Sequence, residues 1–224
     1  MKKYAISDIH GCSKTFKALL EKINFSKEDE LYLLGDYFDR GPDAKGVIDH
    51  IWKLQEEGHT VKCLLGNHEV MLIMAIKDQS MYNVTYEGVC ENFGIQQISE
   101  LPKKYQEWIK TLHLYMEIDE YLLVHAGFNF KAKTPFSDLE AMPWVRHWYG
   151  SIDKEWLGER LIIHGHTPTR ILEIKNSLNT LDDIPAIDID GGCVYEAFGL
   201  GHLCAFDMTE RKFTFVARVD ELEE

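Results

Sequence analysis

The first 65 residues alternate short apolar runs with amphipathic helical patterns, and this alternation limits the fold more than any other feature of the chain. Apolar runs at 3–7, 31–34 and 61–65 predict three strands. Between them, apolar side chains recur at helical spacing after Ser13 and after Asp43, two residues that can cap helices. A strand–helix–strand–helix–strand order favours a parallel sheet covered by helices, and the carboxyl ends of its strands gather ligand-binding groups.

The rest of the chain adds further strand signals without a linker or a repeat. Residues 69–77 and 102–112 are predicted helices, whereas 79–94 carries only weak signals. Further strands are predicted at 114–118, 121–125, 161–164, 186–189, 203–206 and 212–219. Two packed sheets accommodate both halves, so we expect one α/β domain over residues 1–219. An acidic tail at 220–224, expected to fray, follows it.

Charge and composition exclude several classes of protein. The chain has 24 Lys and Arg against 37 Asp and Glu, a formal net charge of −13, which repels phosphate backbones and argues against general nucleic-acid binding. No run approaches the ~20 apolar residues of a membrane span, and Met1 leads directly into a strand rather than a signal-peptide core, so we expect a cytoplasmic protein without a membrane partner. Five scattered cysteines without a CxxC pair fit reduced thiols better than disulfides or a thiolate zinc site.

Five short motifs follow predicted strands and carry side chains that bind metals. They are Asp8-Ile9-His10-Gly11, the GDYFDRG of residues 35–41, the GNHE of 66–69, His125-Ala126-Gly127 and His164-Gly165-His166-Thr167. Imidazole, carboxylate and amide oxygen from several strands can converge on hard or borderline divalent ions, and the lack of cysteine among them disfavours a structural zinc site. Glycine beside each candidate ligand lets the backbone turn sharply and lets a substrate approach closely.

These motifs, in this order, resemble the calcineurin-like metallophosphoesterase superfamily. Within it they are most similar to the PPP-type branch, which includes phage and bacterial serine/threonine phosphatases and symmetrical dinucleoside tetraphosphatases. The resemblance spans residues 8–167 and rests above all on GDxxDRG together with GNHE. Ser7 stands where the family usually has glycine, and Asp190-Gly191-Gly192 replaces a more usual Asp-Thr-Gly. Both replacements are small and leave the expected ligands unchanged. The resemblance implies a two-sheet αββα sandwich.

The resemblance also implies two divalent ions and a set of protein ligands. In such families a bridging water, whose pKa drops toward ~7, is the nucleophile. Oxygen and nitrogen ligands suit Mn²⁺, Fe and Zn²⁺. Mn²⁺ is the expected ion, with Fe or Zn²⁺ as alternatives. The residues carried over are Asp8 and His10 for the first ion, Asp36 as the bridge, and Asn67, His125 and His166 for the second ion.

Further residues match family positions that act on the substrate. His68 would protonate the leaving group, held by the carboxylate of Asp39. Arg40 would grip phosphoryl oxygens as charge builds on them, and Arg146, at the end of a Trp-Val-Arg tripeptide, would supply a second arginine. His164 shares a motif with His166 and is expected to support the site rather than to bind metal.

Each of these residues also has an ordinary structural interpretation. A single histidine is more often a satisfied structural residue than a ligand, and an aspartate after a strand can simply cap a turn, but five coincident motifs argue against this for the whole set. Aromatic side chains between 82 and 108 and between 128 and 149 could line a substrate groove and stack on a nucleobase. Packing is the favoured interpretation for them, because large aromatics mostly bury area.

Three functions therefore compete. The leading hypothesis is a hydrolase of phosphomonoesters, with phosphoserine or phosphothreonine in a phosphorylated protein as the expected substrate. The alternative is hydrolysis of a nucleoside polyphosphate such as a symmetrical dinucleoside tetraphosphate, or another small-molecule phosphate. A less favoured third is a metal-stabilised binding protein without turnover, which predicts a broken ligand set. The motifs do not name the substrate, because specificity in this scaffold resides in the loops.

Overall fold

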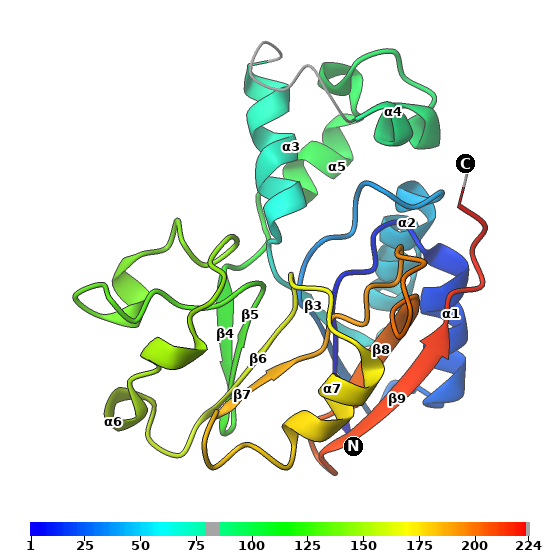
Figure 1. The fold of residues 1–224 in the computed structure, drawn as a ribbon. Helices are drawn as coiled ribbons and strands as arrows, with labels where there is room; N and C mark the ends of the chain where they lie inside the picture. The colour runs from blue at the N-terminus through cyan, green and yellow to red at the C-terminus, as the bar shows by residue number, and fades with distance from the viewer. Residues whose placement is uncertain (79–85, 223–224) are drawn as a thin grey trace.

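A computed structural model describes residues 1–78 and 86–222 of the chain. Its larger sheet has five strands in the order β3 (Thr60–Cys63), β2 (Glu30–Leu33), β1 (Lys3–Ile6), β8 (His202–Asp207) and β9 (Lys212–Ala217). β1, β2 and β3 pair in parallel, whereas β8 pairs antiparallel with β1 and β9 antiparallel with β8. The predicted parallel unit is therefore confirmed, and the two last strands extend it on the side of β1 (Figure 1).

Helices α1 (Ser13–Lys22) and α2 (Ala44–Glu56) cover the outer face of this sheet. Asp43 caps α2 as predicted, because its side chain accepts the N–H of Gly46 at 2.8 Å. Ser13 lies one position inside α1 instead of capping it, since Cys12 is the N-cap residue. The Ser13 hydroxyl donates to the Asp43 carboxylate at 2.7 Å and thereby links the starts of the two helices.

The smaller sheet has four strands in the order β4 (Tyr115–Ile118), β5 (Tyr121–Val124), β6 (Leu161–His164) and β7 (Ala186–Asp188). β5, β6 and β7 run parallel, so their carboxyl ends lie at one edge. The two sheets pack face to face around a core that contains Tyr32 and Leu34 from one layer and Leu123 and Ile163 from the other. Successive side chains of β2 and the residue after it point to opposite faces of the sheet. Leu33 packs in the core under α1 and α2, whereas Tyr32 and Leu34 pack in the core between the two sheets.

Shorter elements surround the sandwich. α3 (Asn67–Lys77), α4 (Glu87–Phe93), the 3₁₀ turn at Ile98–Glu100 and α5 (Lys103–Ile109) lie together above the strand ends in Figure 1. The outer face of the smaller sheet carries irregular chain, two 3₁₀ turns (Pro135–Ser137 and Tyr149–Ser151) and the short α6 (Lys154–Leu157). α7 (Ile171–Ser177) packs beside β7. Sequence periodicity did not predict α6 and α7, because four and seven residues are too few to show it.

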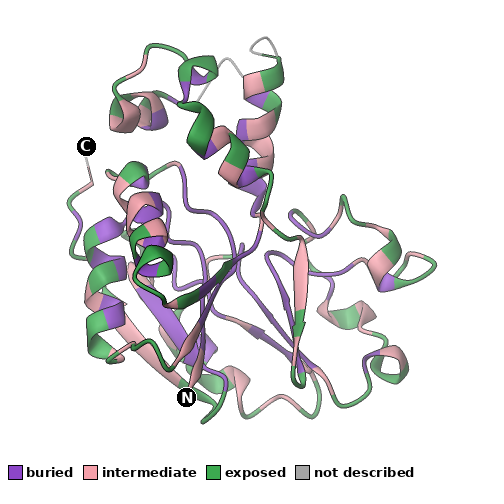
Figure 2. Ribbon diagram, turned by 180° about the vertical axis from the view of Figure 1, so that it is seen from behind, coloured by how far each residue is buried: buried purple, intermediate pink, exposed green. Residues whose placement is uncertain are grey.

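The strands are mostly buried, whereas the helices expose their outer sides (Figure 2). The aromatic side chains outside the motifs mainly pack, as favoured from sequence. Tyr105 and Trp108 pack with Trp52, and Phe128 packs with Trp156 in a cluster on the smaller sheet. Tyr82, one of the aromatics considered, lies outside the described residues.

The start of the acidic tail is a correction to the sequence prediction. Asp220, expected to belong to a frayed tail, is buried, and its carboxylate accepts the N–H groups of Lys14 and Thr15 at 3.0 and 2.8 Å and the Thr15 hydroxyl at 2.6 Å. It therefore satisfies donors that the first turn of α1 leaves without helical partners. All five cysteines lie in the described segments and are free thiols, as predicted. Within those segments, every helix is too short or too polar to cross a bilayer.

Candidate active site

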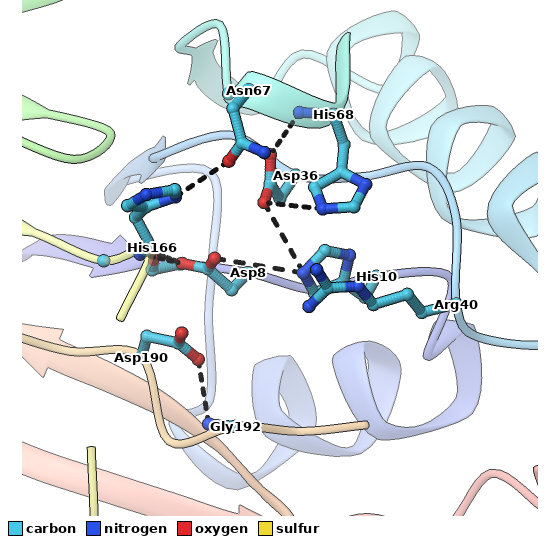
Figure 3. Close-up of polar contacts among 12 residues, drawn as sticks. Asp8, His10, Asp36, Arg40, Asn67, His68, His166, Asp190 and Gly192 are labelled. Carbon is cyan, nitrogen blue, oxygen red and sulfur yellow. Dashed lines mark hydrogen bonds and ion pairs between the residues drawn. The ribbon is translucent and has the colours of Figure 1, made fainter. Parts of the chain in front are cut away.

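The motif side chains meet where the strands end. Asp8 follows β1, Asp36 follows β2, Asn67 begins α3 after β3, and His125 and His166 follow β5 and β6. All five are buried, and Figure 3 shows the labelled members of the set pointing toward one another. Because both sheets direct the carboxyl ends of their parallel strands to the same edge, residues up to 158 positions apart come into contact there.

Several of these residues adopt a backbone conformation that side chains disfavour. Asp8, His10, Asp36 and His166 have φ values of 50°, 45°, 56° and 73°. Such left-handed conformations cost of the order of 1–3 kcal/mol each and occur mainly where the surroundings enforce them, typically at functional sites. The backbone strain at these strand ends is therefore typical of a functional site.

Glu69 holds the loop that carries Asp36, a role that the sequence analysis missed. The Glu69 side chain is fully buried and accepts the N–H groups of Asp36 and Tyr37, both at 2.8 Å, and that of Gly66 at 3.0 Å. A Cβ at Gly66 would lie 2.1 Å from Asp36 Oδ1, so only glycine allows this close approach. Glu69 is the glutamate of the GNHE motif, and this was the feature of the sequence that could have indicated its role.

One group of metal-binding atoms forms around His10. Its Nδ1 lies 3.3 Å from the carbonyl of Phe38, to which only an N–H can donate, so the lone pair is on Nε2. That Nε2 lies 3.5 Å from Asp36 Oδ2 and 4.0 Å from Asp8 Oδ1. Three atoms with free electron pairs thus face a common space.

A second group forms around His125 on the other side of Asp36. His125 Nδ1 donates to the carbonyl of Leu34 at 2.8 Å, which leaves its Nε2 lone pair 3.0 Å from Asn67 Oδ1 and 3.5 Å from Asp36 Oδ1. His166 Nδ1 lies 2.8 Å from the same Asn67 oxygen, and among the described residues its buried Nε2 has no hydrogen-bond partner. The two carboxylate oxygens of Asp36 therefore face two different groups.

The electrostatics of both groups suit bound cations. Burial, together with the charges of Asp8 and Glu69, raises the pKa of Asp36 well above its ordinary value. Burial also lowers the pKa of His10 well below its ordinary value, and burial with the neighbouring His125 lowers that of His166 to about 3. Neutral imidazoles and crowded carboxylates are the donors that divalent ions require, and a cation would relieve the crowding. The residues present therefore fit divalent metal ions.

Asp190 belongs to this electrostatic environment, although the sequence analysis noted its motif only as a departure. It is buried, and burial together with the charge of Asp8 raises its pKa well above the ordinary value. Its Oδ1 accepts the N–H of Gly192 at 2.8 Å (Figure 3). A Cβ at Gly191 would lie 2.5 Å from the carbonyl of His202, so glycine at this position matches close backbone packing. Ser7, the other departure from the family pattern, donates a hydrogen bond from its hydroxyl to the Asp8 carboxylate.

His68 lies beside the first group and pairs with Asp39. Its Nδ1 is 2.9 Å from Asp39 Oδ2, and its Nε2 is 3.9 Å from Asp36 Oδ2. Burial alone would raise the pKa of Asp39, but the hydrogen bond and charge of His68 outweigh it and lower that pKa. His10, Asp36 and His68 also offer atoms close enough together to share one ion, so the role of His68 needs an experiment.

The two predicted arginines lie on opposite sides of the candidate site. Arg40 is exposed next to the His10 group, and its Nη1 donates to the hydroxyl of Tyr195 at 2.7 Å. Arg146 is exposed next to His166, and its Nη1 donates to the hydroxyl of Thr167 at 3.1 Å. Tyr195 is a further contact that the sequence analysis did not identify, because it follows no motif. Each arginine therefore lies beside one of the two groups of candidate ligands.

His164 supports the site from its outer side. Its Nδ1 is 3.0 Å from the Gly165 carbonyl and must donate there, so its Nε2 accepts the hydroxyl of Tyr149 at 2.5 Å. Burial lowers the pKa of His164 to about 4, which keeps the ring neutral for this contact. The residue thus fixes Tyr149 in place.

Fold and site together define a metallophosphoesterase, that is, a hydrolase with a two-sheet α/β sandwich and candidate metal-binding groups at the strand ends. The chain belongs to the calcineurin-like phosphoesterase family, whose model matches residues 1–197. The expected fold and resemblance are thereby confirmed. The third hypothesis, a binding protein without turnover, is not supported, since the chain is a hydrolase by family and the expected ligand residues are all present.

Curated relatives carry the name symmetrical bis(5′-nucleosyl)-tetraphosphatase. The protein of Nitrosomonas europaea is 29% identical over 80% of this chain and 71% of its own length. That of Buchnera aphidicola subsp. Acyrthosiphon pisum is 33% identical over 58% of this chain, but the match spans only 45% of the relative. A solved structure described as a candidate diadenosine tetraphosphatase superposes with a TM-score of 0.67 at 20% identity, covering 96% of this chain and 92% of the other, which supports the fold.

Proposed function

We propose that this protein hydrolyses symmetrical dinucleoside tetraphosphates, the alternative of the sequence analysis, in preference to phosphorylated proteins. The observation that carries the proposal is the similarity over 80% of the chain to the symmetrical tetraphosphatase of Nitrosomonas europaea, in a molecule whose candidate site combines metal-binding groups with two arginines. A tetraphosphate carries several negative charges in a row, and arginines on two sides of the site suit it. The cytoplasmic location expected from sequence stays a prediction.

The site residues take the roles that their geometry supports. Asp8, His10 and Asp36 would hold one divalent ion, and Asp36 would share a second with Asn67, His125 and His166. When bound, such ions lower the pKa of a coordinated water toward ~7 and polarise phosphoryl oxygens. Because the set contains nitrogen and oxygen donors without thiolates, Mn²⁺ is the proposed ion, with Fe or Zn²⁺ as alternatives.

The chain's own residues would bind and orient the phosphate groups. Arg40 and Arg146 donate to phosphoryl oxygens from two sides, which fixes the chain of phosphates across the site and offsets charge as it develops. Asp39 holds the imidazole of His68 at 2.9 Å, so that Nε2 faces the site and can donate a proton to the departing oxygen. The six proposed ligands are all buried at the strand ends.

Phosphomonoester hydrolysis remains the second candidate, and the His68–Asp39 pair favours it. An alkoxide leaving group, such as that of phosphoserine, needs a proton far more than a nucleoside diphosphate does. A held acid is therefore more valuable to a phosphatase than to a tetraphosphatase.

A comparison of substrates with one preparation tests the proposal. The purified protein with added Mn²⁺ should hydrolyse diadenosine tetraphosphate with a higher kcat/KM than a phosphoserine peptide, and should release ADP rather than ATP and AMP. The same protein after chelation should be inactive on both. A higher kcat/KM for the phosphopeptide would overturn the proposal in favour of the second candidate.

A further inference from the structure

A cavity of about 530 Å³ lies beside the candidate active site, on the outer face of the smaller sheet. Alternation along the strands turns His164 of β6 and Asp188 of β7, which are paired neighbours, toward this face. The chain at 146–150 borders the cavity on one side, and α7 with the segment after it borders the other. Figure 1 shows α7 beside the end of β7.

The cavity shares Arg146 with the proposed phosphate site. Arg146 and Thr167 line the cavity and are joined by a hydrogen bond of 3.1 Å. Thr167 directly follows His166, whose ring faces Asn67 in the second group of metal-binding atoms. A phosphate bound by Arg146 would therefore lie next to this cavity.

Acidic side chains line the interior, and burial together with the charge of Asp190 raises the pKa of Asp188 well above its ordinary value. Asp188 lines the cavity, and its two oxygens accept the N–H of Asp190 at 2.9 Å and the hydroxyl of Thr169 at 3.2 Å. A carboxylate offers about four acceptor positions, so it can accept further O–H or N–H donors. Glu173 adds a second acidic group to the lining. An uncharged, hydroxyl-bearing group fits here, because a carboxyl group can exchange hydrogen bonds with hydroxyl groups.

The walls are apolar and partly aromatic. Tyr149, which the contact with His164 fixes in place, and the aliphatic side chains of Ile174 and Ile184 line the space. Its volume lies in the usual ~300–1,000 Å³ range of small-molecule sites, which combine apolar walls with a few polar groups that orient the ligand. A flat base against these walls and hydroxyl groups toward the carboxylate would satisfy both parts of the lining.

We infer that this cavity is a nucleoside subsite, in which one nucleoside of the substrate binds with its ribose hydroxyls toward Asp188 and its base against Tyr149, Ile174 and Ile184. The inference rests on the proposed function, since it names where that substrate's uncharged end lies. Arg146 stands at the boundary between the two ends of the ligand and holds the phosphate nearest to the nucleoside.

Two substitutions inside the cavity test the subsite. Ala186→Leu fills space, because Ala186 is buried and lines the cavity, and Asp188→Asn replaces the carboxyl group by an amide of nearly the same size. Each should lower the ratio of kcat/KM for diadenosine tetraphosphate to kcat/KM for p-nitrophenyl phosphate by about tenfold or more, the scale of a misfitted or unpaired group in a pocket. Asp183→Asn is the matched control, since Asp183 is a nearby exposed carboxylate outside the cavity lining, and it should leave the ratio unchanged.

The outcomes separate the subsite from the proposed function. If the wild-type protein prefers diadenosine tetraphosphate but both variants keep its substrate ratio, the subsite is wrong and the function stands. If the wild-type protein prefers a phosphopeptide, the function fails, and the subsite is then judged by calorimetric titration of the metal-loaded protein with adenosine alone. Saturable binding that Ala186→Leu or Asp188→Asn weakens would support it, and the absence of such binding would overturn it. Thermal unfolding of each variant identifies any loss that comes from misfolding.

Discussion

Replacing His68 with Asn tests whether this histidine is an acid or a metal ligand. The substitution removes the imidazole that lies 2.9 Å from Asp39 and 3.9 Å from Asp36. It leaves the backbone N–H of residue 68, which donates to Asp36 Oδ1 at 3.1 Å, so the carboxylate should keep its orientation. Asn is smaller than His and polar, so it suits a buried position beside a carboxylate.

The expected loss depends on the leaving group. General acid catalysis contributes about 10²–10⁴ in rate, which is about 3–5 kcal/mol at 1.36 kcal/mol per factor of ten. An alkyl phosphate, whose alkoxide leaving group needs the proton, should lose activity by that full factor. Diadenosine tetraphosphate releases a weakly basic nucleoside diphosphate, so it should lose less than about tenfold.

The assay measures metal content and both rates for each variant. His125→Asn is the control, because the Nε2 of His125 faces Asn67 and Asp36 at 3.0 and 3.5 Å and its loss should release metal and slow both substrates alike. For His68→Asn, metal should remain and the two rates should diverge. If it strips a metal, or slows both substrates by one factor with metal retained, the acid role is refuted and His68 belongs with the ligands.

Four other sets of substitutions test the candidate site and the stability of the helices. Asp36→Asn should weaken binding of both divalent ions, and two ions retained at near-native affinity in a metal titration would contradict the bridging role. Arg40→Ala and Arg146→Ala should each keep the metal but lower kcat by about 10²–10³ and weaken inhibition by inorganic phosphate; unchanged kinetics would place that arginine outside the site. Asp220→Ala should lower the free energy of unfolding in urea by about 0.5–2 kcal/mol, because α1 loses its carboxylate partner, and an unchanged midpoint would show that the cap contributes nothing. Burial, with the nearby lysines, lowers the pKa of His50 below its ordinary 6.5, so the unfolded chain binds a proton that the native state does not as the pH falls below that value. His50→Gln should therefore reduce the loss of stability between about pH 7.5 and about pH 5.5, and an equal loss in both proteins would contradict this reasoning.

The sequence by itself determined the local structure and the chemistry at the strand ends. Apolar runs and helical spacing predicted β1, α1, β2, α2 and β3, because these patterns reflect which side of each element is buried. Asp8, Asp36 and Asn67 could be expected to meet, because parallel strands end at one edge of the sheet. The motifs also predicted the family, because the residues of the candidate site lie close together in the sequence within each motif, directly after a strand.

Only the tertiary structure decided which distant segments pair. No local pattern tells β8 to pair with β1 about 200 residues earlier, or the Asp220 carboxylate to reach the start of α1, because these contacts depend on the path of the whole chain. The positions of the two arginines on opposite sides of the site, at Tyr195 and at Thr167, arise in the same way. The cavity between the 146–150 segment and α7 has no sequence motif either, because its lining comes from segments that are adjacent only after both sheets have packed. The candidate nucleoside subsite therefore had to be inferred from the folded molecule.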